Sequence, residues 1–293
     1  MYFNFLQQFF SEFDYPNDAR SALIENYQKI YNSSNLHTKF VETINIYEQS
    51  MQCDFDFSLH VIKEISIQAS IHEYSAYLLY LICLTPILKR YYISNNFEEK
   101  LWKETVFDWK YKAVECNLIY NVWGTFVPTW FCGYLQLKRF GIGRLQFEIG
   151  TFPKNYSNGI FSVEKNQPVI DVHIPRTGER LNRQETLDSY KKAAEFFKER
   201  FNIERIFVCH SWLLFPPNKT MLKDGSNLKL FMDDFDIIEF GYDPDYSERW
   251  RLFDSLEEDP NKLPSNSSLR RAYIELMKRG DKMGWGYGVF CLR

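Results

Sequence analysis

The sequence of 293 residues lacks the cysteine spacing that marks a zinc site or a disulfide scaffold. Its 6 cysteines are scattered along the chain, without a CxxC pair or a mixed Cys/His ligand spacing. This absence argues against structural zinc and against a dense disulfide framework. We therefore expect no metal and reduced thiols, as in a cytoplasmic protein.

Long apolar runs and an excess of charge of one sign are also missing. The longest apolar stretch runs from Ala76 to Leu88 and is interrupted by Thr85 and Pro86, so it favours a buried helix over a membrane span. The N-terminus has no basic segment followed by an apolar run, so we expect no signal peptide. With 35 basic and 38 acidic residues, the net charge of −3 favours neither nucleic acid nor a membrane as partner.

Three common catalytic signatures are absent as well. Without GxGxxG or GxxxxGK the sequence indicates neither a Rossmann nor a P-loop site, and without GxSxG it has no serine elbow. The string Arg139–Arg144 is similar to a phosphate loop but precedes a strand pattern rather than a helix, so we interpret it as a turn.

Helical periodicity dominates the first part of the chain. Apolar residues at Ile65, Ala69, Ala76 and Leu79 recur at helical spacing, and His72 lies on the same stripe, where a core histidine is the favoured interpretation. Aromatic residues, which make up 18% of the chain, are suited to filling such a core. We predict a helical bundle over residues 1–128.

After Val127-Pro128 the spacing of apolar residues changes from a helical period to a mixture of strand and helix patterns. We therefore predict a mixed α/β domain over residues 129–293. A hairpin is expected between the strands 159–163 and 169–174. The strands 169–174 and 205–214 are expected to be parallel and joined by a crossover through the helix 183–201. The predicted strands are 143–148, 159–163, 169–174, 205–214, 235–240 and 287–292, with helices over 183–201 and 268–278. A surface excursion with a short helix inside it is expected over 243–266. The fold class is therefore α+β.

The crossover at residues 169–214 is the most informative stretch. Asn182 is placed to cap the helix, whose free N–H groups and positive dipole end would favour an anion. Just before it, Gly178 can relax the backbone and Arg176 can supply charge. An ordinary turn explains the same residues equally well.

Two residues are candidates for proton transfer. Glu148 shares the polar face of its strand with Gln146, although most such residues are simply solvated. His210 lies between Cys209 and Ser211, but neighbours on a strand point to opposite faces, so a Cys/His or Ser/His nucleophile pair is disfavoured. His210 is then either a base toward a substrate or a structural histidine.

Several strings together resemble a family of bacterial acyltransferases with a helical N-terminal domain and a GNAT-like C-terminal domain. These strings are Trp109-Lys110, Gly124–Phe126, Gly143–Glu148, Val172–Pro175, Ser189-Tyr190 and Val208–Leu214. The resemblance covers nearly the whole chain. It implies an α+β protein, a helical bundle followed by a GNAT-like mixed α/β domain.

The resemblance also implies an acyl-CoA cleft between the strands 169–174 and 205–214. Pantetheine would pair with the first strand, and the pyrophosphate would bind the loop and helix start. The implied co-substrate residues are Val169, Asp171, His173, Arg176, Thr177, Gly178 and Arg183. The loop departs from the family, since Arg176–Leu181 does not reproduce the usual Q/R-x-x-G-x-G/A run.

The expected activity is N-acyl transfer from acetyl-CoA or another acyl-CoA to a small-molecule or peptide amine, with Glu148 or His210 as base. Backbone N–H groups of the strand 169–174 would polarise the thioester. The first alternative is a non-catalytic GNAT-fold binding or regulatory module, since a fold alone does not confer activity. The second is a Cys/His hydrolase using Cys209.

Overall fold

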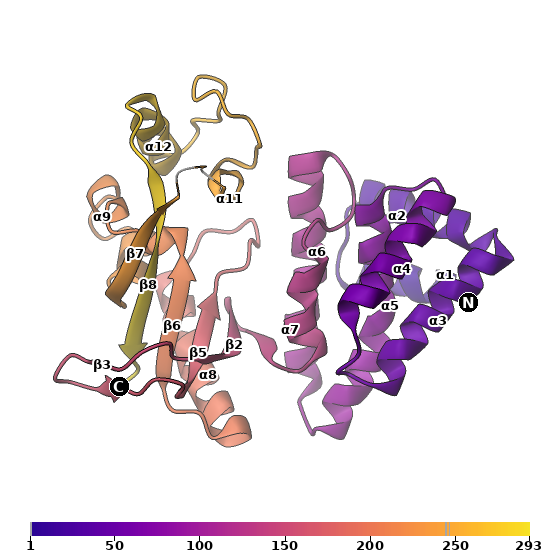
Figure 1. The fold of residues 1–293 in the computed structure, drawn as a ribbon, viewed down its shortest axis with the longest axis horizontal. Helices are drawn as coiled ribbons and strands as arrows, with labels where there is room; N and C mark the ends of the chain where they lie inside the picture. Colours follow the sequence, from indigo (N-terminus) through magenta and orange to yellow (C-terminus); the bar gives the residue numbers. More distant parts are fainter. Residues whose placement is uncertain (1, 244, 246) are drawn as a thin grey trace. The chain divides into compact units, whose positions relative to one another are not determined.

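The computed structural model describes residues 2–243, 245 and 247–293. The chain divides into two compact units, Met1–Gly141 and Ile142–Arg293, shown as ribbons in Figure 1. The predicted boundary at 128/129 stays a prediction. The first unit is helical and the second carries the sheet, so the predicted α+β class is confirmed.

The first unit is a bundle of amphipathic helices joined by short turns. Its long helices are α1 Phe3–Glu12, α2 Asn17–Tyr31, α3 Ser34–Gln49, α4 Phe55–Gln68, α5 Glu73–Ser94 and α6 Glu99–Tyr120. The central helix is α5, in which every residue from Ser75 to Thr85 is buried although Pro86 lies within the helix. None of the described helices is long and apolar enough to cross a membrane.

The apolar stripe around His72 is not one helix, and His72 is not a core residue. Helix α4 ends at Gln68 and α5 begins at Glu73, with Ser70 at a φ of 52° in between. His72 is the N-cap of α5, exposed, and its Nδ1 accepts a hydrogen bond from Tyr74 N at 3.1 Å. The apolar spacing continued by chance across a turn that local periodicity cannot detect.

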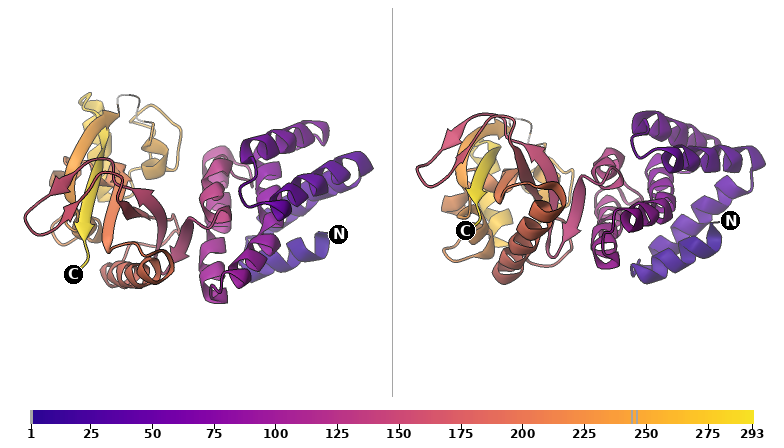
Figure 2. Two further views of the ribbon diagram at one scale, coloured as in Figure 1. Left: turned by 60° about the horizontal axis from the view of Figure 1, so that its bottom comes forward. Right: turned by 90° about the horizontal axis from the view of Figure 1, so that it is seen from below.

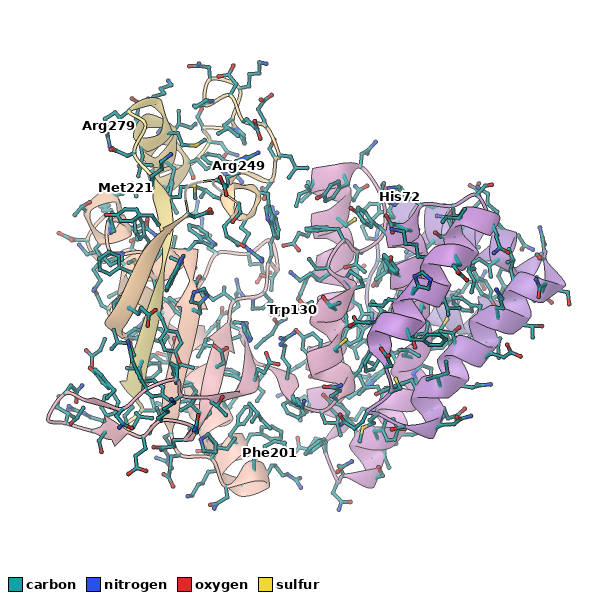
Figure 3. All side chains as sticks on the ribbon, viewed as in Figure 1. His72, Trp130, Phe201, Met221, Arg249 and Arg279 are labelled. Carbon is teal, nitrogen blue, oxygen red and sulfur yellow. The ribbon has the colours of Figure 1, made fainter. Side chains whose placement is uncertain are left out.

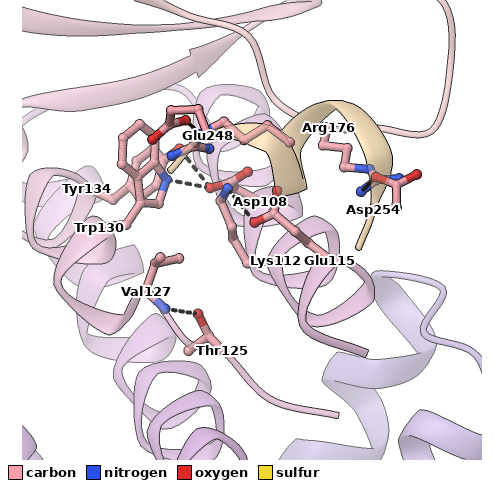
Figure 4. Close-up of polar contacts among 11 residues, drawn as sticks. Asp108, Lys112, Glu115, Thr125, Val127, Trp130, Tyr134, Arg176, Glu248 and Asp254 are labelled. Atoms are coloured by element: carbon pink, nitrogen blue, oxygen red, sulfur yellow. Dashed lines mark hydrogen bonds and ion pairs between the residues drawn. The ribbon is translucent and has the colours of Figure 1, made fainter. Parts of the chain in front are cut away.

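A buried polar network holds the end of the first unit together (Figure 4). Asp108 Oδ2 on α6 accepts from Trp130 Nε1 at 2.9 Å and from the Tyr134 hydroxyl at 3.0 Å. The two aromatic residues lie on the short helices η1 Pro128–Phe131 and α7 Cys132–Leu135. These bonds tie the segment after residue 128 to the helices, which is why the compact unit extends to Gly141.

The second unit is built on one mixed sheet with strand order β1-β2-β5-β6-β8-β7 among the described residues. Its strands are β2 Leu145–Thr151, β5 Pro168–His173, β6 Ile206–Ser211, β7 Asp236–Asp243 and β8 Met283–Cys291, and the edge strand β1 Arg139–Ile142 crosses the boundary between the two units. The pair β3 Tyr156–Ser157 and β4 Ser162–Val163 forms a separate small hairpin, visible in Figures 1 and 2. The string Arg139–Arg144 is thus a strand and a turn rather than a turn alone.

The predicted hairpin between residues 159–163 and 169–174 is wrong. β4 pairs with β3, whereas β5 pairs antiparallel with β2 from Gln146↔His173 to Thr151↔Pro168. The reason is packing: Phe152, Val163 and Val169 join one apolar cluster, so the β3–β4 hairpin folds over the sheet instead of extending it.

The parallel crossover is confirmed: β5 leads through α8 Arg183–Phe201 into β6. Asn182 caps α8, its Oδ1 accepting from Gln184 N at 2.9 Å and from Glu185 N at 3.3 Å. On the inner side of α8, Tyr190 contacts the rings of Phe147, Phe207 and Phe290 from three different strands. This aromatic core covers one face of the sheet, and the site lies on part of the other face.

The remaining helices lie between β6 and β8. They are η2 Trp212–Leu214, α9 Asn218–Met221, α10 Asn227–Met232, α11 Arg249–Phe253 and α12 Ser268–Lys278. In the described part of the predicted excursion over 243–266, the expected short helix is α11, and α12 has the predicted bounds. Figure 3 marks these parts of the unit by the labelled side chains of Met221, Arg249 and Arg279.

Candidate functional site

The strands β5 and β6 open away from each other at their carboxyl ends. Their parallel ladder covers two pairs of the described residues, Ile170↔Phe207 and Asp171↔Val208, although β5 continues to His173 and β6 to Ser211. On their other sides the two strands are paired over their full lengths, β5 with β2 and β6 with β8. The sheet is therefore open between the ends of these two strands, and the facing backbone edges of both strands border the opening.

Three titratable side chains meet on the β5 side of this opening. His173 Nε2 is 3.1 Å from Glu148 Oε2 and 3.9 Å from Asp171 Oδ2. The register explains this, because Glu148 lies directly opposite Asp171 and Gln146 opposite His173, on one face of the antiparallel pair. The side chains of His173 and Glu148 are each about one fifth exposed, at 21% and 22%. An imidazole held by a carboxylate in this way can accept or pass on a proton.

His210 lies on the β6 side of the same face. Asp171 pairs with Val208, so the residues two further along each strand, His173 and His210, project from the same side of the sheet. His210 is exposed, and its ring lies 4.7 Å from the indole ring of Trp285 on β8. The structure thus places both predicted bases, Glu148 and His210, on one face of the sheet, on either side of the opening.

Cys209 and Ser211 are not on that face. Cys209 is 2% exposed, and burial, reinforced by the charge of Asp171, raises the pKa of its thiol well above the ordinary value. The Ser211 hydroxyl accepts a hydrogen bond from Leu213 N at 3.2 Å, as the N-cap of η2. A buried, protonated thiol that points away from His210 gives no support to the hydrolase interpretation.

Two residues of the site, Trp285 and Tyr287, were missed in the sequence. Tyr287 pairs with His210 across β6 and β8, and burial, with Asp171, Cys209 and Glu239 as further causes, raises the pKa of its hydroxyl. The phenol therefore stays protonated at neutral pH. A signal was present in the alternation of glycine and aromatic residues over 284–288, which indicates a strand with one crowded face and one aromatic face.

The loop after β5 is shaped by a side chain from the β1–β2 turn. Arg144 donates from Nη1 to Pro175 O at 3.1 Å and from Nη2 to Glu179 O at 3.2 Å. Inside the loop, Thr177 Oγ1 accepts from Glu179 N at 3.2 Å. Gly178 has a φ of 86° and nothing within 4 Å of where a Cβ would stand. The loop is held at both ends and leaves open space at its glycine.

The two arginines predicted to bind phosphate are both paired with aspartates. Arg176 forms an ion pair with Asp254, and Arg183 makes a two-pronged contact with Asp234 at 2.5 and 2.7 Å. Two amides of the first turn of α8, those of Gln184 and Glu185, donate to Asn182, as described above. A phosphate at this helix start would have to compete with these groups.

The other predicted co-substrate residues are spread along β5. Val169 is buried and lies one residue before the ladder with β6 begins, at the end of β5 away from the opening. Asp171 is in the last pair of that ladder, and His173 lies in the open part. The structure therefore brings Asp171 and His173 to the opening and leaves Val169 outside it. Among the described residues, no group of three or more His, Cys, Asp or Glu side chains could hold a metal ion.

Comparisons with known proteins show the family and the fold of this chain. The family model described as GNAT-like C-terminal domain matches residues 140–290. The crystal structure of an acyltransferase mutant in complex with octanoyl-CoA matches with a TM-score of 0.79 at 16% identity, covering 99% of this chain and 88% of the other. An acyltransferase in complex with decanoyl-CoA and teicoplanin matches with a TM-score of 0.75 at 15% identity, covering 98% and 88%. No curated protein sequence matches the chain.

Proposed function

Because the chain belongs to the family defined by the GNAT-like C-terminal domain, we propose that it is an N-acyltransferase that uses acyl-CoA. The observation that carries this proposal is the opening between β5 and β6, where the parallel ladder is limited to two residue pairs. Such an opening borders two strand edges along which an extended, amide-containing ligand can lie, and pantetheine is one. The polar residues beside it supply the groups that acyl transfer needs.

In this proposal the pantetheine pairs with the open part of β5, and the pyrophosphate lies at the loop that contains Arg176, Thr177 and Gly178. Arg183 contributes positive charge at the start of α8. The acyl group is acetyl or a longer chain: similar structures carry octanoyl-CoA and decanoyl-CoA, which supports including medium chains. The acceptor is the amine of a small molecule or a peptide; teicoplanin is bound in one similar structure.

The chemistry proposed is direct attack of the amine on the thioester, without a covalent enzyme intermediate. Glu148 or His210 takes a proton from the amine, the new C–N bond forms, and the C–S bond breaks to release CoA as thiolate. Glu148 can act through His173, since the two side chains are 3.1 Å apart. Backbone N–H groups of β5 polarise the thioester carbonyl while charge develops on its oxygen.

Calorimetric titration with acetyl-CoA, octanoyl-CoA and decanoyl-CoA tests the proposal. We expect saturable binding of at least one of them, followed by release of free thiol when an accepted amine is added. A wild-type protein that gives neither heat nor a thermal shift at millimolar acyl-CoA would contradict it.

A second candidate is a GNAT-fold module that binds without turnover. It is favoured by the contacts of Arg176 and Arg183 with aspartates and by the occupied amides of α8. The two candidates differ in one measurable result. Binding of CoA without any acyl transfer across a broad panel of amines would support the module and contradict the enzyme.

A further inference from the structure

A second arginine, Arg270, lies beside the loop that follows β5. Its Nη2 is 2.6 Å from Asp254 Oδ2, while the other carboxylate oxygen of Asp254 is paired with Nη1 of Arg176. Figure 4 shows the Arg176–Asp254 pair. Two guanidinium groups therefore share one carboxylate, and this cluster of three side chains carries a net charge of about +1 because arginine stays protonated.

Arg270 is held in place by contacts that do not involve Asp254. Its Nε donates to Leu252 O at 2.8 Å, and its Nη1 donates to Asn266 Oδ1 at 2.8 Å. Asp254 itself is fixed by the backbone, as the C-cap of α11 with a φ of 58°. The guanidinium of Arg270 is thus oriented by its neighbours even without the carboxylate.

The cluster is shielded from water but still reachable. The side chains of Arg176, Asp254 and Arg270 are 29%, 22% and 16% exposed. Partial burial strengthens charge interactions relative to bulk water, and a guanidinium matches the geometry of phosphate oxygens. One carboxylate cannot balance two arginines, so a second anion would be favoured here.

We propose that Arg176 and Arg270 form a binding site for a phosphate group of acyl-CoA, which Asp254 partly neutralises while no co-substrate is bound. The proposal rests on the proposed function and extends its site from the loop after β5 to α11 and α12. A phosphate that enters takes over part of the hydrogen bonding to the guanidiniums and is repelled by the carboxylate. Arg270 is then a binding residue, and Asp254 weakens the binding of the co-substrate.

Calorimetric titration of the full-length protein with CoA and with 3′-dephospho-CoA tests this site. Arg270→Gln should weaken CoA binding by about 10- to 100-fold, the usual effect of losing one charge-assisted contact. Asp254→Asn should tighten it by about 3-fold, because a like charge is removed within a few ångströms of the phosphate. Arg271→Gln is the matched control: Arg271 is exposed, donates to Ser265 O at 2.9 Å, and should leave the affinity unchanged.

The outcomes distinguish a failure of the phosphate-site proposal from a failure of the proposed function. No binding of CoA to the wild-type protein would overturn both proposals. Binding by the wild type with an unchanged affinity in Arg270→Gln, or with a weaker affinity in Asp254→Asn, would overturn the phosphate site alone. If Arg270→Gln weakens CoA but not 3′-dephospho-CoA, the bound group is the 3′-phosphate, and if it weakens both, the bound group is the pyrophosphate.

Thermal unfolding of each variant shows whether it is folded, so that a loss of binding caused by misfolding can be recognised. Asp254→Asn and Arg270→Lys serve if Arg270→Gln does not fold, since Arg270→Lys keeps the charge but removes the planar fork. Arg270→Lys should then show an intermediate affinity for CoA, and an affinity equal to that of the wild type would argue against recognition by the fork.

Discussion

At the scale of single residues, the chemistry of a side chain in the candidate site depends on which face of the sheet it occupies. His210 and Cys209 are neighbours in the chain, yet one is exposed and the other is 2% exposed. Glu148 and His173 are far apart in the chain, yet 3.1 Å apart in space. Thiol labelling tests whether Cys209 is reactive, and the activity of variants tests whether Glu148 or His210 acts as the base.

Cys209 should resist alkylation in the folded protein. Its pKa is raised by burial, so at pH 8 the thiol stays protonated, and the thiolate that reacts with iodoacetamide is scarce. Peptide mapping after labelling should show Cys291, which is partly exposed, modified well before Cys209. In urea both should react. Equal labelling of the two thiols in the native protein would restore the hydrolase interpretation.

Replacing the proton-accepting group should reduce turnover while binding persists. We expect either Glu148→Gln or His210→Ala to lower kcat by about 10²- to 10⁴-fold, the usual contribution of a general base. Calorimetry should show acyl-CoA affinity within a few-fold of wild type. The control is Glu164→Gln, an exposed glutamate in the turn before β5. If both site variants kept full activity, the catalytic assignment would be wrong.

At the scale of elements, the sheet depends on the alternation of residues in β8. Trp285 and Tyr287 face the site, while the glycines that alternate with them leave room for neighbouring atoms on the other face. A Cβ on Gly286 would lie 2.2 Å from Leu214 O, and one on Gly288 would lie 2.7 Å from Phe235 Cβ. The close approach of η2 to β8 thus requires glycine.

Gly286→Ala should destabilise the second unit, because the carbonyl of Leu214 belongs to the backbone and cannot easily move. We expect a loss of about 2–4 kcal/mol in the free energy of unfolding, measured by urea titration. Gly150→Ala on β2 is the matched control, since its nearest contact for a Cβ is an ordinary 3.6 Å. A loss no larger for Gly286→Ala than for Gly150→Ala would contradict the packing argument.

At the scale of the whole molecule, the chain consists of two compact units, and the proposed co-substrate site belongs to the second. A ligand that binds only the native state stabilises it, by about 2.7 kcal/mol at a concentration of 100 times Kd. Hydrogen exchange should therefore slow at the open end of β5 and in the loop over 174–182 when acyl-CoA is added. Unchanged exchange in both segments, under conditions where calorimetry shows saturation, would place the ligand elsewhere.

Local signals in the sequence predicted those elements whose ends are marked by residues close to them in the chain. Asn182 before α8 and Gly280 after α12 are examples: the cap and the turn that ends a helix act over three or four residues. The same reasoning failed at His72, where apolar spacing crossed a turn, and at β4, whose partner is set by packing.

By itself, the sequence determined the helical first half, the mixed second half, the crossover from β5 through α8 to β6, and the opposite orientations of Cys209 and His210. Only the tertiary structure decided that Glu148 meets His173, that Tyr287 and Trp285 lie beside His210, and that Arg176 and Arg270 share Asp254. The physical reason is the distance along the chain over which each interaction acts. Helix caps and strand alternation act between neighbours, whereas strand order and register join segments far apart, and no local pattern records them.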